Sequence, residues 1–460
     1  MKKAFLVSFL AFLLLFLLAP LALADSDLSG YEVRVLLSST SAANEYEIRV
    51  ENGCYQIFNE KGKELGELEE GDEAIFSYEY GKYWLEWQDE AEDSSAPFLI
   101  DSEDPEARFS LNGKTYRGGF KLMMNNAYCY GINVIDIELY LYGVVGRELG
   151  YNYHEEALKA QAVASRSYAL ANVSSSNIFY DVTATTSSQV YGGYSAESEA
   201  VTRAVDETRG QVLMYKKEVV PAYYSSNAGG HTEDIEKVWS SDEIPIIGVP
   251  SPYDEKAGNY SSYGASCYSW SVDYSPAELV KLANTYGKTD IGSYKGITMS
   301  QSYDGQTSVS GRAMQVTIQG TKGSVTATKN NICSLLNLKS NLISISDASG
   351  EQVAGYVLGA DGQVRAWESF DALYVIGSTL KAMLANGDKD TFYVHDGSRV
   401  KEVSKHGTYA KGVRISGKGY GHGVGMSQWG AIAMADDGYT WEEIIEHYYC
   451  GGGVKIAAYY

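Results

Sequence analysis

Three sharply marked helix starts constrain the fold of this chain more than any other feature of its sequence. Asn152, followed three residues later by Glu155, opens an Ala-rich segment near 153–171. Ser275 and Thr440 each precede a glutamate by three residues, which is the capping-box pattern, and apolar side chains follow at helical spacing. We therefore expect a few separate helices with long stretches of other sequence between them.

The sequence before and between these helices is of strand type. Polar and apolar side chains alternate over 46–50 and 314–318, and the run 34–37 also suits strand pairing. The acidic, serine-rich stretch 89–104 has the composition of a solvated loop. Together these patterns predict an α+β fold, with antiparallel β elements around the Ala-rich helix near 153–171 and a β-rich portion before it.

The N-terminus has the parts of a secretory signal. Lys2 and Lys3 precede 21 uncharged, mostly apolar residues, and Ala22-Leu23-Ala24 forms a small-x-small cleavage pattern, with Pro20 breaking the helix nearby. An uncleaved anchor is the alternative, because 21 residues are just long enough to span a bilayer. In either case we expect residues 25–460 outside the cytoplasm, with at most one N-terminal membrane anchor.

The charge balance excludes nucleic acid as a partner. The chain has 59 acidic residues against 37 Lys and Arg, a net charge of −22, and no basic cluster beyond Lys216-Lys217. Binding to phosphates needs clustered positive charge. Removal of the signal with its two lysines would make the charge −24. The 38 tyrosines fit β-rich construction and, in smaller part, faces for sugar stacking.

Cysteine and histidine usage indicates neither a dense disulfide framework nor a zinc site. Five scattered cysteines leave room for one or two disulfides and at least one free thiol. The sequence has no Cys-x-x-Cys pair and no two His four residues apart, so close-spaced zinc ligands are absent. The cysteines are Cys54, Cys129, Cys267, Cys333 and Cys450.

Residues 348–411 have the pattern of an insertion with a short repeat. Tyr356-Val357, Tyr374-Val375 and Tyr393-Val394 recur at intervals of 18 and 19 residues, and Asp-Gly turns follow the first and the last. We expect stacked hairpins here. Their role is either a structural addition or a face that binds glycan or a partner.

Two short segments carry side chains suited to chemistry. Glycines alternate over 417–425 around His422, which lets the backbone approach a ligand closely, but the spacing fits neither a phosphate loop nor a hydrolase elbow. His422 is thus a candidate site residue or a packed structural histidine. Glu148 lies among apolar residues before the Ala-rich helix, where burial would raise its pKa and suit a general acid. The alternative is that the neighbouring Arg147 forms an ion pair with Glu148.

Several segments in a fixed order carry a family resemblance. In chain order they are Leu139-Tyr140-Leu141-Tyr142-Gly143-Val144-Val145 with Glu148, residues 156–170, Gln189-Val190-Tyr191-Gly192-Gly193, residues 204–210, Ser225-Ser226-Asn227-Ala228-Gly229-Gly230-His231-Thr232 and residues 421–428. The series resembles the stage II sporulation protein D and amidase-enhancer family of bacterial cell-wall proteins. The resemblance extends over about 116–456, apart from 348–411.

The resemblance implies a lytic transglycosylase that acts on peptidoglycan glycan strands. The catalytic acid of the family corresponds to Glu148. One carboxylate is enough, because the 6-hydroxyl of N-acetylmuramic acid is the nucleophile and no water is activated. The resemblance also implies substrate-binding side chains near the same groove, namely Lys159, Gln161, Arg166, Tyr168, Gln189, Tyr191, Ser225, Ser226, His422 and Gln428.

The chain departs from the family pattern at three places. Leu149-Gly150 replaces the usual Met-Pro after the catalytic position, which leaves the turn but weakens the expected rigidity of Glu148. The segment 181–189 lacks the cysteines often found there, so we expect no cofactor and no zinc, although some members bind zinc. Cys450 stands where the family often has Pro, as a free thiol or half of a disulfide.

We therefore expect a signal peptide at 1–24, an N-terminal β-rich portion at 25–115, a catalytic domain in two parts at 116–347 and 412–460, and the insertion at 348–411. The predicted activity is cleavage of the MurNAc–GlcNAc bond of peptide-stripped glycan with 1,6-anhydro-MurNAc formation, in cell-wall remodelling or sporulation. The protein would be secreted or wall-associated, with glycan strands and a cell-wall amidase as partners. The alternative is a non-catalytic amidase activator or wall-binding module.

Overall fold

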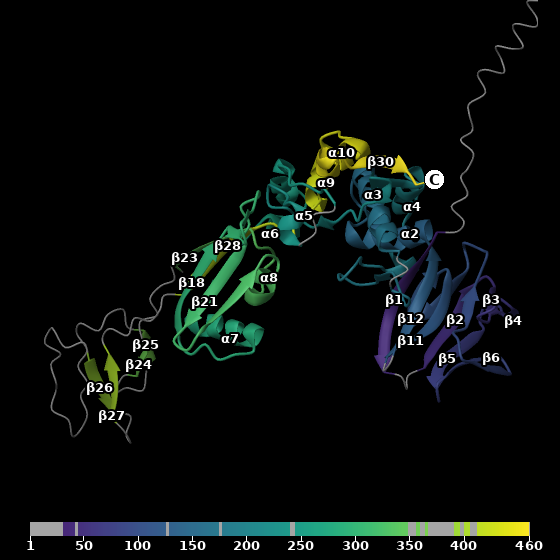
Figure 1. The fold of residues 1–460 in the computed structure, drawn as a ribbon, viewed down its shortest axis with the longest axis horizontal. Helices are drawn as coiled ribbons and strands as arrows, with labels where there is room; N and C mark the ends of the chain where they lie inside the picture. The colour runs from purple at the N-terminus through teal and green to yellow at the C-terminus, as the bar shows by residue number, and fades with distance from the viewer. Residues whose placement is uncertain are drawn as a thin grey trace, which may run out of the picture.

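The computed structural model describes residues 31–41, 45–125, 128–173, 177–239, 244–347 and 412–459, together with four strands at 356–358, 364–366, 391–395 and 400–404 (Figure 1). The predicted signal at 1–24 lies outside these residues. None of the helices described is long and apolar enough to cross a membrane.

The N-terminal part consists of two mostly antiparallel sheets that share one core. Phe120 in one sheet contacts Phe76 and Phe109 in the other, at ring-centroid distances of 5.1 and 5.8 Å. The sheet orders are β13-β1-β12-β11-β8-β3-β4 and β10-β9-β2-β5-β6-β7. The strands are β1 Glu32–Ser41, β2 Tyr46–Asn52, β3 Tyr55–Phe58, β4 Glu64–Leu68, β5 Glu73–Glu79, β6 Lys82–Trp87, β7 Glu90–Ser94, β8 Leu99–Asp101, β9 Arg108–Leu111, β10 Lys114–Arg117, β11 Gly119–Asn125, β12 Tyr128–Asp136 and β13 Val182–Thr183.

The strands expected at 34–37 and 46–50 are confirmed as parts of β1 and β2, but the loop expected over 89–104 is wrong. That stretch contains β7 and β8. The backbone of β7 pairs with β6 from Trp87 opposite Glu90, while most β7 side chains are exposed. An acidic composition indicates that side chains are exposed to solvent, and an edge strand offers that exposure while its backbone is paired on one side with its neighbour.

A helical part follows, centred on α3 (Figure 1). The Ala-rich helix predicted near 153–171 is confirmed as α3, but His154 and not Asn152 caps it, by accepting a hydrogen bond from Glu156 N. Helices α9 and α10 come from near the other end of the chain and pack against α3. The elements are α2 Ile137–Glu148, α3 Glu155–Asn172, η1 Gly193–Ala196, α4 Glu199–Glu207, β14 Gln211–Tyr215, β15 Glu218–Val219, β16 Tyr224–Ser225, α5 Ile235–Val238, η2 Pro252–Asn259, α6 Ser262–Tyr268, β29 Met426–Ser427, α9 Gln428–Asp436, α10 Trp441–Tyr449, η3 Cys450–Gly452 and β30 Lys455–Ala458.

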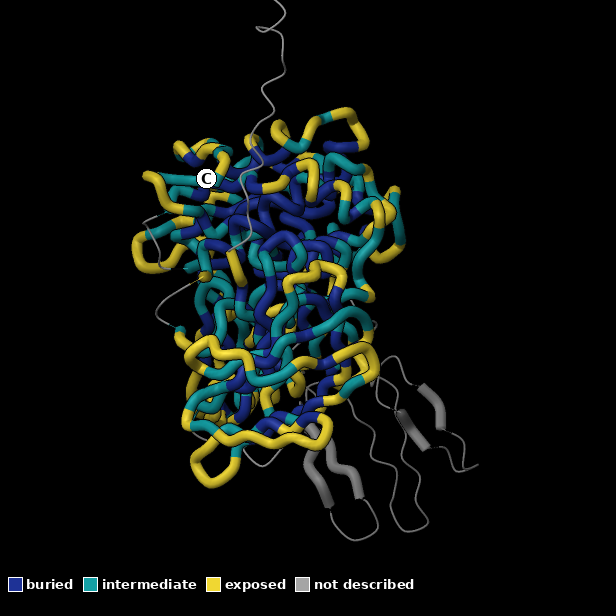
Figure 2. The backbone as a smooth tube through the Cα atoms, turned by 90° about the vertical axis from the view of Figure 1, so that its right-hand side faces the viewer, coloured by how far each residue is buried: buried dark blue, intermediate teal, exposed yellow. Residues whose placement is uncertain are grey.

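A second hydrophobic core, separate from the first, lies within the later residues. Its side chains come mainly from α7, α8 and the sheets β18-β21-β22 and β17-β28-β23. Figure 2 shows buried backbone inside the folded chain and exposed residues mainly along loops. The bounds are β17 Ser269–Tyr274, α7 Pro276–Gly287, β18 Tyr294–Ser300, β19 Ser302–Tyr303, β20 Gln306–Thr307, β21 Gln315–Gly320, β22 Ser324–Thr328, α8 Asn331–Leu336, β23 Ile343–Asp347 and β28 Val413–Lys418.

Both capping boxes predicted from the sequence are confirmed. Ser275 caps α7 together with Glu278, and Thr440 caps α10 together with Glu443. The alternation at 314–318 is confirmed in β21, which pairs with β22 through the glycine turn.

The predicted insertion begins and ends at neighbouring points, because Asp347 at the end of β23 pairs with Val413 at the start of β28. Between them lie two antiparallel pairs, β24 Tyr356–Leu358 with β25 Val364–Ala366 and β26 Thr391–His395 with β27 Val400–Ser404. The middle repeat, Tyr374-Val375, lies outside the described residues. The domain boundaries stay predictions.

Candidate active site

Glu148 is the last residue of α2, and contacts along that helix fix its position. Asp136 caps the first turn by accepting two backbone hydrogen bonds, at 2.8 and 3.3 Å. Gly143 allows close packing against the segment that follows Gln189, since a Cβ there would come within 2.6 Å of the Tyr191 ring. The carboxyl end of α2 is thereby held next to that segment.

The carboxylate of Glu148 is half-buried and accepts a short hydrogen bond. Its Oε1 lies 2.5 Å from Val190 N. Burial raises the pKa of Glu148, and interactions with Val190 N–H and the side chains of Gln428 and Tyr224 oppose part of that rise. Among the ion pairs of the described residues, none includes Glu148. Arg147 is exposed and contributes only a weaker, favourable charge interaction with that carboxylate.

Two glutamine side chains connect the end of α2 to α3 and α9. Gln428, the first residue of α9, donates from Nε2 to the backbone carbonyl of Glu148 at 3.1 Å and to Oε1 of Gln161 at 3.3 Å. Gln161 in turn donates to Ser165 Oγ at 2.9 Å. Ser427 caps α9, so the start of that helix sets the position of Gln428.

Gln189 extends this network beyond Ser165. Its Nε2 donates to the Tyr224 hydroxyl at 3.0 Å and to the Ser165 carbonyl at 3.3 Å, and its Oε1 accepts from the Tyr140 hydroxyl at 3.3 Å. Gln189 is fully buried. The structure therefore brings three predicted glutamines, at 161, 189 and 428, to the surroundings of Glu148.

Aromatic rings and His422 lie beside this network. Tyr223 is 5.7 Å from Tyr168, 4.6 Å from Trp239 and 6.2 Å from His422, measured between ring centroids. His422 Nδ1 accepts a hydrogen bond from Val424 N at 3.0 Å. Burial lowers the pKa of His422 to about 4, with a nearby arginine adding to the effect. The imidazole is thus neutral at pH 7.

The two predicted serines lie on β16 and just after it. β16 pairs in parallel with β29, with Ser225 opposite Ser427. The hydroxyl of Ser225 is buried and has no hydrogen-bond partner among the residues described. The carbonyl of Ser226 accepts from Trp429 N at 3.0 Å, which ties this strand to α9.

Lys159 is not brought to Glu148. A helix turns by about 100° per residue, so Lys159 points away from Gln161, by about 200° around α3. Its Nζ lies 3.2, 3.0 and 2.7 Å from carboxylate oxygens of Glu155, Glu156 and Glu207. The helix position matches the family pattern, but packing turns this side chain toward three glutamates.

Arg166 and Tyr191 lie in the core. Arg166 forms a fully buried, bidentate ion pair with Glu138, at 2.8 and 2.6 Å, on a different side of α3 from Gln161. The Tyr191 hydroxyl donates to Oδ1 of the buried Asn133 at 3.0 Å. These two residues hold α2, α3 and the 190 segment together, and the expectation that they line the same surface as Glu148 is not met.

Potential metal ligands do not converge in the part of the chain that the structure describes. It contains no group of three or more His, Cys, Asp or Glu side chains able to hold a metal ion. All five cysteines are described, and each is a free thiol, so the structure contains none of the one or two disulfides for which the sequence left room.

Several contributors to this site were not predicted from the sequence. Ser165 could have been predicted from its spacing, because it lies one helical turn after Gln161. Tyr223 and Tyr224 could have been predicted because they directly precede the motif that begins at Ser225. No sequence pattern indicates the backbone N–H of Val190 or Trp239, because only tertiary packing brings them near the other site residues. The missed contributors are Tyr140, Ser165, the N–H of Val190, Tyr223, Tyr224 and Trp239.

Comparison with known proteins points to one family. Residues 125–215 match the family model of the Stage II sporulation protein, SpoIID, and residues 254–363 match a domain of unknown function, DUF8618. The first match contains Glu148, α3 and the 189–191 segment.

Relatives cover most of the chain. An uncharacterized protein of Brachyspira hyodysenteriae is 28% identical over 76% of this chain and 74% of its own. The amidase enhancer of Bacillus subtilis is 30% identical over 75% of this chain but only 44% of its own length. Stage II sporulation protein D of Bacillus subtilis is 24% identical over 70% of this chain and 75% of its own.

The SpoIID match lies on the helices and loop that surround Glu148, and relatives bearing both family names align over at least 70% of the chain. Family membership also supports a role related to the cell wall. The chain belongs to the stage II sporulation protein D and amidase-enhancer family.

Proposed function

We propose that this protein is an exported peptidoglycan lytic transglycosylase in which Glu148 is the catalytic acid. The observation that carries the proposal is one half-buried carboxylate among neutral hydrogen-bonding side chains. Burial raises its pKa, and no ion pair of the described residues includes it. Such a group holds a proton at a pH where exposed glutamates are ionised, which is what a general acid requires.

In the proposed reaction, Glu148 gives its proton to the oxygen between N-acetylmuramic acid and N-acetylglucosamine as that bond breaks. The carboxylate then takes the proton of the muramic 6-hydroxyl, whose oxygen bonds to C1 and closes a 1,6-anhydro ring. The second proton replaces the first, so the enzyme is regenerated and no water is consumed. Because the nucleophile belongs to the substrate, proximity lowers the barrier and no second carboxylate is needed.

The surroundings of Glu148 suit both halves of this cycle. Val190 N–H stabilises the carboxylate that forms after the first proton transfer. Tyr168, Tyr223 and Trp239 offer half-buried faces on which pyranose rings can stack. The net charge of −22 opposes anionic polymers, so a largely uncharged, peptide-stripped glycan is the substrate we propose.

A second candidate function is the non-catalytic activation of a cell-wall amidase. The Bacillus subtilis relative at 30% identity is named an amidase enhancer, and this name supports it. An amidase is also a partner under the first proposal, because it would supply the peptide-stripped strands.

Digestion of purified, peptide-free glycan strands followed by mass spectrometry separates the two functions. We expect 1,6-anhydro-muramic ends from the wild type and at least a hundredfold fewer from the Glu148→Gln variant. The matched control is Glu199→Gln, which removes the charge of a 97% exposed glutamate and should leave the products unchanged. Products with reducing ends would indicate a hydrolase. The absence of cleavage would favour the second candidate function, activation of an amidase. Abundant product from Glu148→Gln would refute the assignment of Glu148 as the catalytic acid.

We also propose that residues 25–460 act outside the cytoplasm, secreted or attached to the wall. Cell fractionation with N-terminal sequencing tests this. A mature start at Asp25 indicates signal cleavage, an intact Met1 in the membrane fraction indicates an anchor, and protein confined to the cytoplasm contradicts export.

A further inference from the structure

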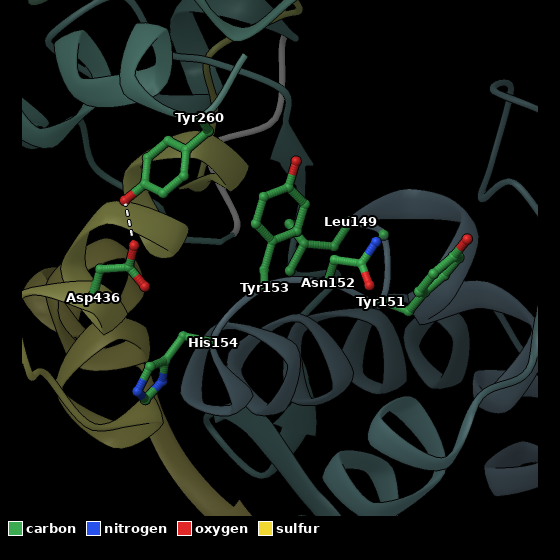
Figure 3. A pocket seen from close by; sticks show the side chains of 8 residues that line it. Leu149, Tyr151, Asn152, Tyr153, His154, Tyr260 and Asp436 are labelled. Atoms are coloured by element: carbon green, nitrogen blue, oxygen red, sulfur yellow. Dashed lines mark hydrogen bonds between the residues drawn. The ribbon is translucent and has the colours of Figure 1, made fainter.

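A pocket of about 610 Å³ lies beyond the turn that follows Glu148 (Figure 3). Its volume falls within the range of about 300–1,000 Å³ typical of small-molecule sites. One wall is the connection between α2 and α3, and the other comes from the ends of η2 and α9. Its lining residues are Leu149, Gly150, Tyr151, Asn152, Tyr153, His154, Tyr260 and Asp436.

The sequence fixes the shape of the first wall. Gly150 has a positive φ of 96°, which reverses the chain directly after Leu149. A Cβ at Gly150 would lie 3.2 Å from the Tyr153 ring, so glycine also leaves that ring in place. His154 then caps α3. The wall is therefore held by a helix at each end.

Aromatic faces make up the apolar part of the pocket. Tyr153 packs edge-on against Tyr260 at 6.3 Å and against the buried Trp429 at 5.7 Å, so its ring is fixed. Tyr151 projects from the same loop with 58% of its surface exposed. Figure 3 shows Tyr260 and Asp436 across from Tyr153 and Asn152.

Polar atoms with unused hydrogen-bonding capacity share the pocket with these rings. The Tyr260 hydroxyl donates to Oδ2 of Asp436 at 2.8 Å, and Oδ1 has no partner among the described residues. His154 Nδ1 accepts the N–H of Glu156 at 3.3 Å, which leaves the Nε2–H of that ring as a donor. No described residue bonds the side-chain amide of Asn152.

We propose that this pocket is a second sugar-binding site, which takes an N-acetylhexosamine unit. Fixed ring faces match the apolar face of a pyranose, and a free carboxylate oxygen, an amide and an imidazole N–H match its hydroxyl and acetamido groups. The carboxylate of Asp436 disfavours an anionic ligand, and Lys256, at the end of η2, pairs with Asp437. That the sugar belongs to the glycan strand cut at Glu148 rests on the proposed function.

The test is an NMR titration with the β-1,4-linked tetramer of N-acetylglucosamine. Every protein carries Glu148→Gln, so that turnover does not deplete the tetramer. We expect it to shift the backbone signals of Gly150 and Asn152 and the ring signals of His154, while inorganic phosphate does not. Tyr151→Ala and Asp436→Asn should each weaken these shifts about tenfold in affinity.

The matched control is Tyr128→Ala, which removes a 54% exposed tyrosine from β12, outside the pocket, and should bind like the parent. Circular dichroism melting shows that each variant is folded. The proposal is overturned if saturating tetramer leaves the loop signals unmoved, or if Tyr151→Ala binds like the control. Pocket binding without anhydro products from the wild type would refute only the proposed function, and anhydro products without pocket shifts would refute only this site.

Discussion

The polar residues on the two sides of α3 have different roles, one at the candidate active site and the other in stabilising the fold. On one side, Gln161 and Ser165 exchange neutral hydrogen bonds near Glu148. On the other side, Arg166 and Lys159 are bound to carboxylates within the fold. All four residues lie within two turns of one helix. The comparison teaches that a shared motif does not imply a shared role, because rotation of about 100° per residue sends neighbours to different surroundings.

Breaking the Arg166 pair should have the largest effect. Arg166→Met leaves the Glu138 carboxylate buried without its cation, so we expect the free energy of unfolding to fall by about 3–5 kcal/mol. Urea unfolding measures this loss. Replacing both charges, with Glu138→Gln added to Arg166→Met, should recover part of it, because the unpaired buried charge is removed.

The same variants distinguish a structural arginine from a substrate-binding one. Under the structural role, the double variant that regains stability also regains glycan cleavage. If it folds stably but makes no product, Arg166 acts in the reaction, and the comparison between the sides of α3 fails.

The sequence was most informative where local rules decide the structure. Thr440 with Glu443, and the alternation through Tyr46 and Ile48, depend on nearest neighbours along the chain, and both were predicted correctly. The ordered motifs also indicated Glu148 and the glutamines around it. The predicted N-cap of α3 was wrong, because Asn152 and His154 are both polar and lie only two residues apart, and it is His154 that caps the helix.

What the sequence did not determine is which side of a helix faces which partner. Lys159 and Arg166 were expected beside Glu148 from their motif alone. Their direction depends on how α2, α4 and β14 pack against α3, and this is decided by contacts between segments far apart in the chain. Trp239 likewise packs against Tyr223 through contacts between segments, and no local sequence pattern predicts this contact.

Changing Gln161 tests the other side of α3. Gln161→Met keeps the length of the side chain but removes the oxygen that accepts from Gln428. We expect glycan cleavage to slow roughly tenfold, because the end of α2 is held less firmly, and stability to fall by only about 1 kcal/mol. A loss of several kcal/mol with normal cleavage per folded molecule would show that this side is structural too.

The contribution of Glu148 to stability should change with pH. We expect this change to be smaller than the effects above and to have a definite direction. Because burial raises its folded pKa, wild-type stability relative to Glu148→Gln is fully present at low pH and is lost as pH rises through that folded pKa. Cleavage should fall over the same pH range, since the acid must be protonated. Unfolding and product formation measured over a pH series check both, and a stability difference that is flat with pH would contradict the raised pKa.

Replacing Lys159 should have the smallest effect on stability. The contribution of Lys159 to stability should change with pH in the opposite direction to that of Glu148. Lys159→Met removes contacts to partly exposed carboxylates, so we expect a loss of no more than about 1 kcal/mol and unchanged cleavage. The lysine lowers the folded pKa of Glu155, so that part of its contribution is present near neutral pH and is lost as pH falls through that pKa. The stability difference between wild type and variant should therefore narrow in acid, whereas the Glu148 difference narrows in base. If Lys159→Met slowed cleavage at unchanged stability, the lysine would act on substrate, and the ion pairs around it would be secondary to that role.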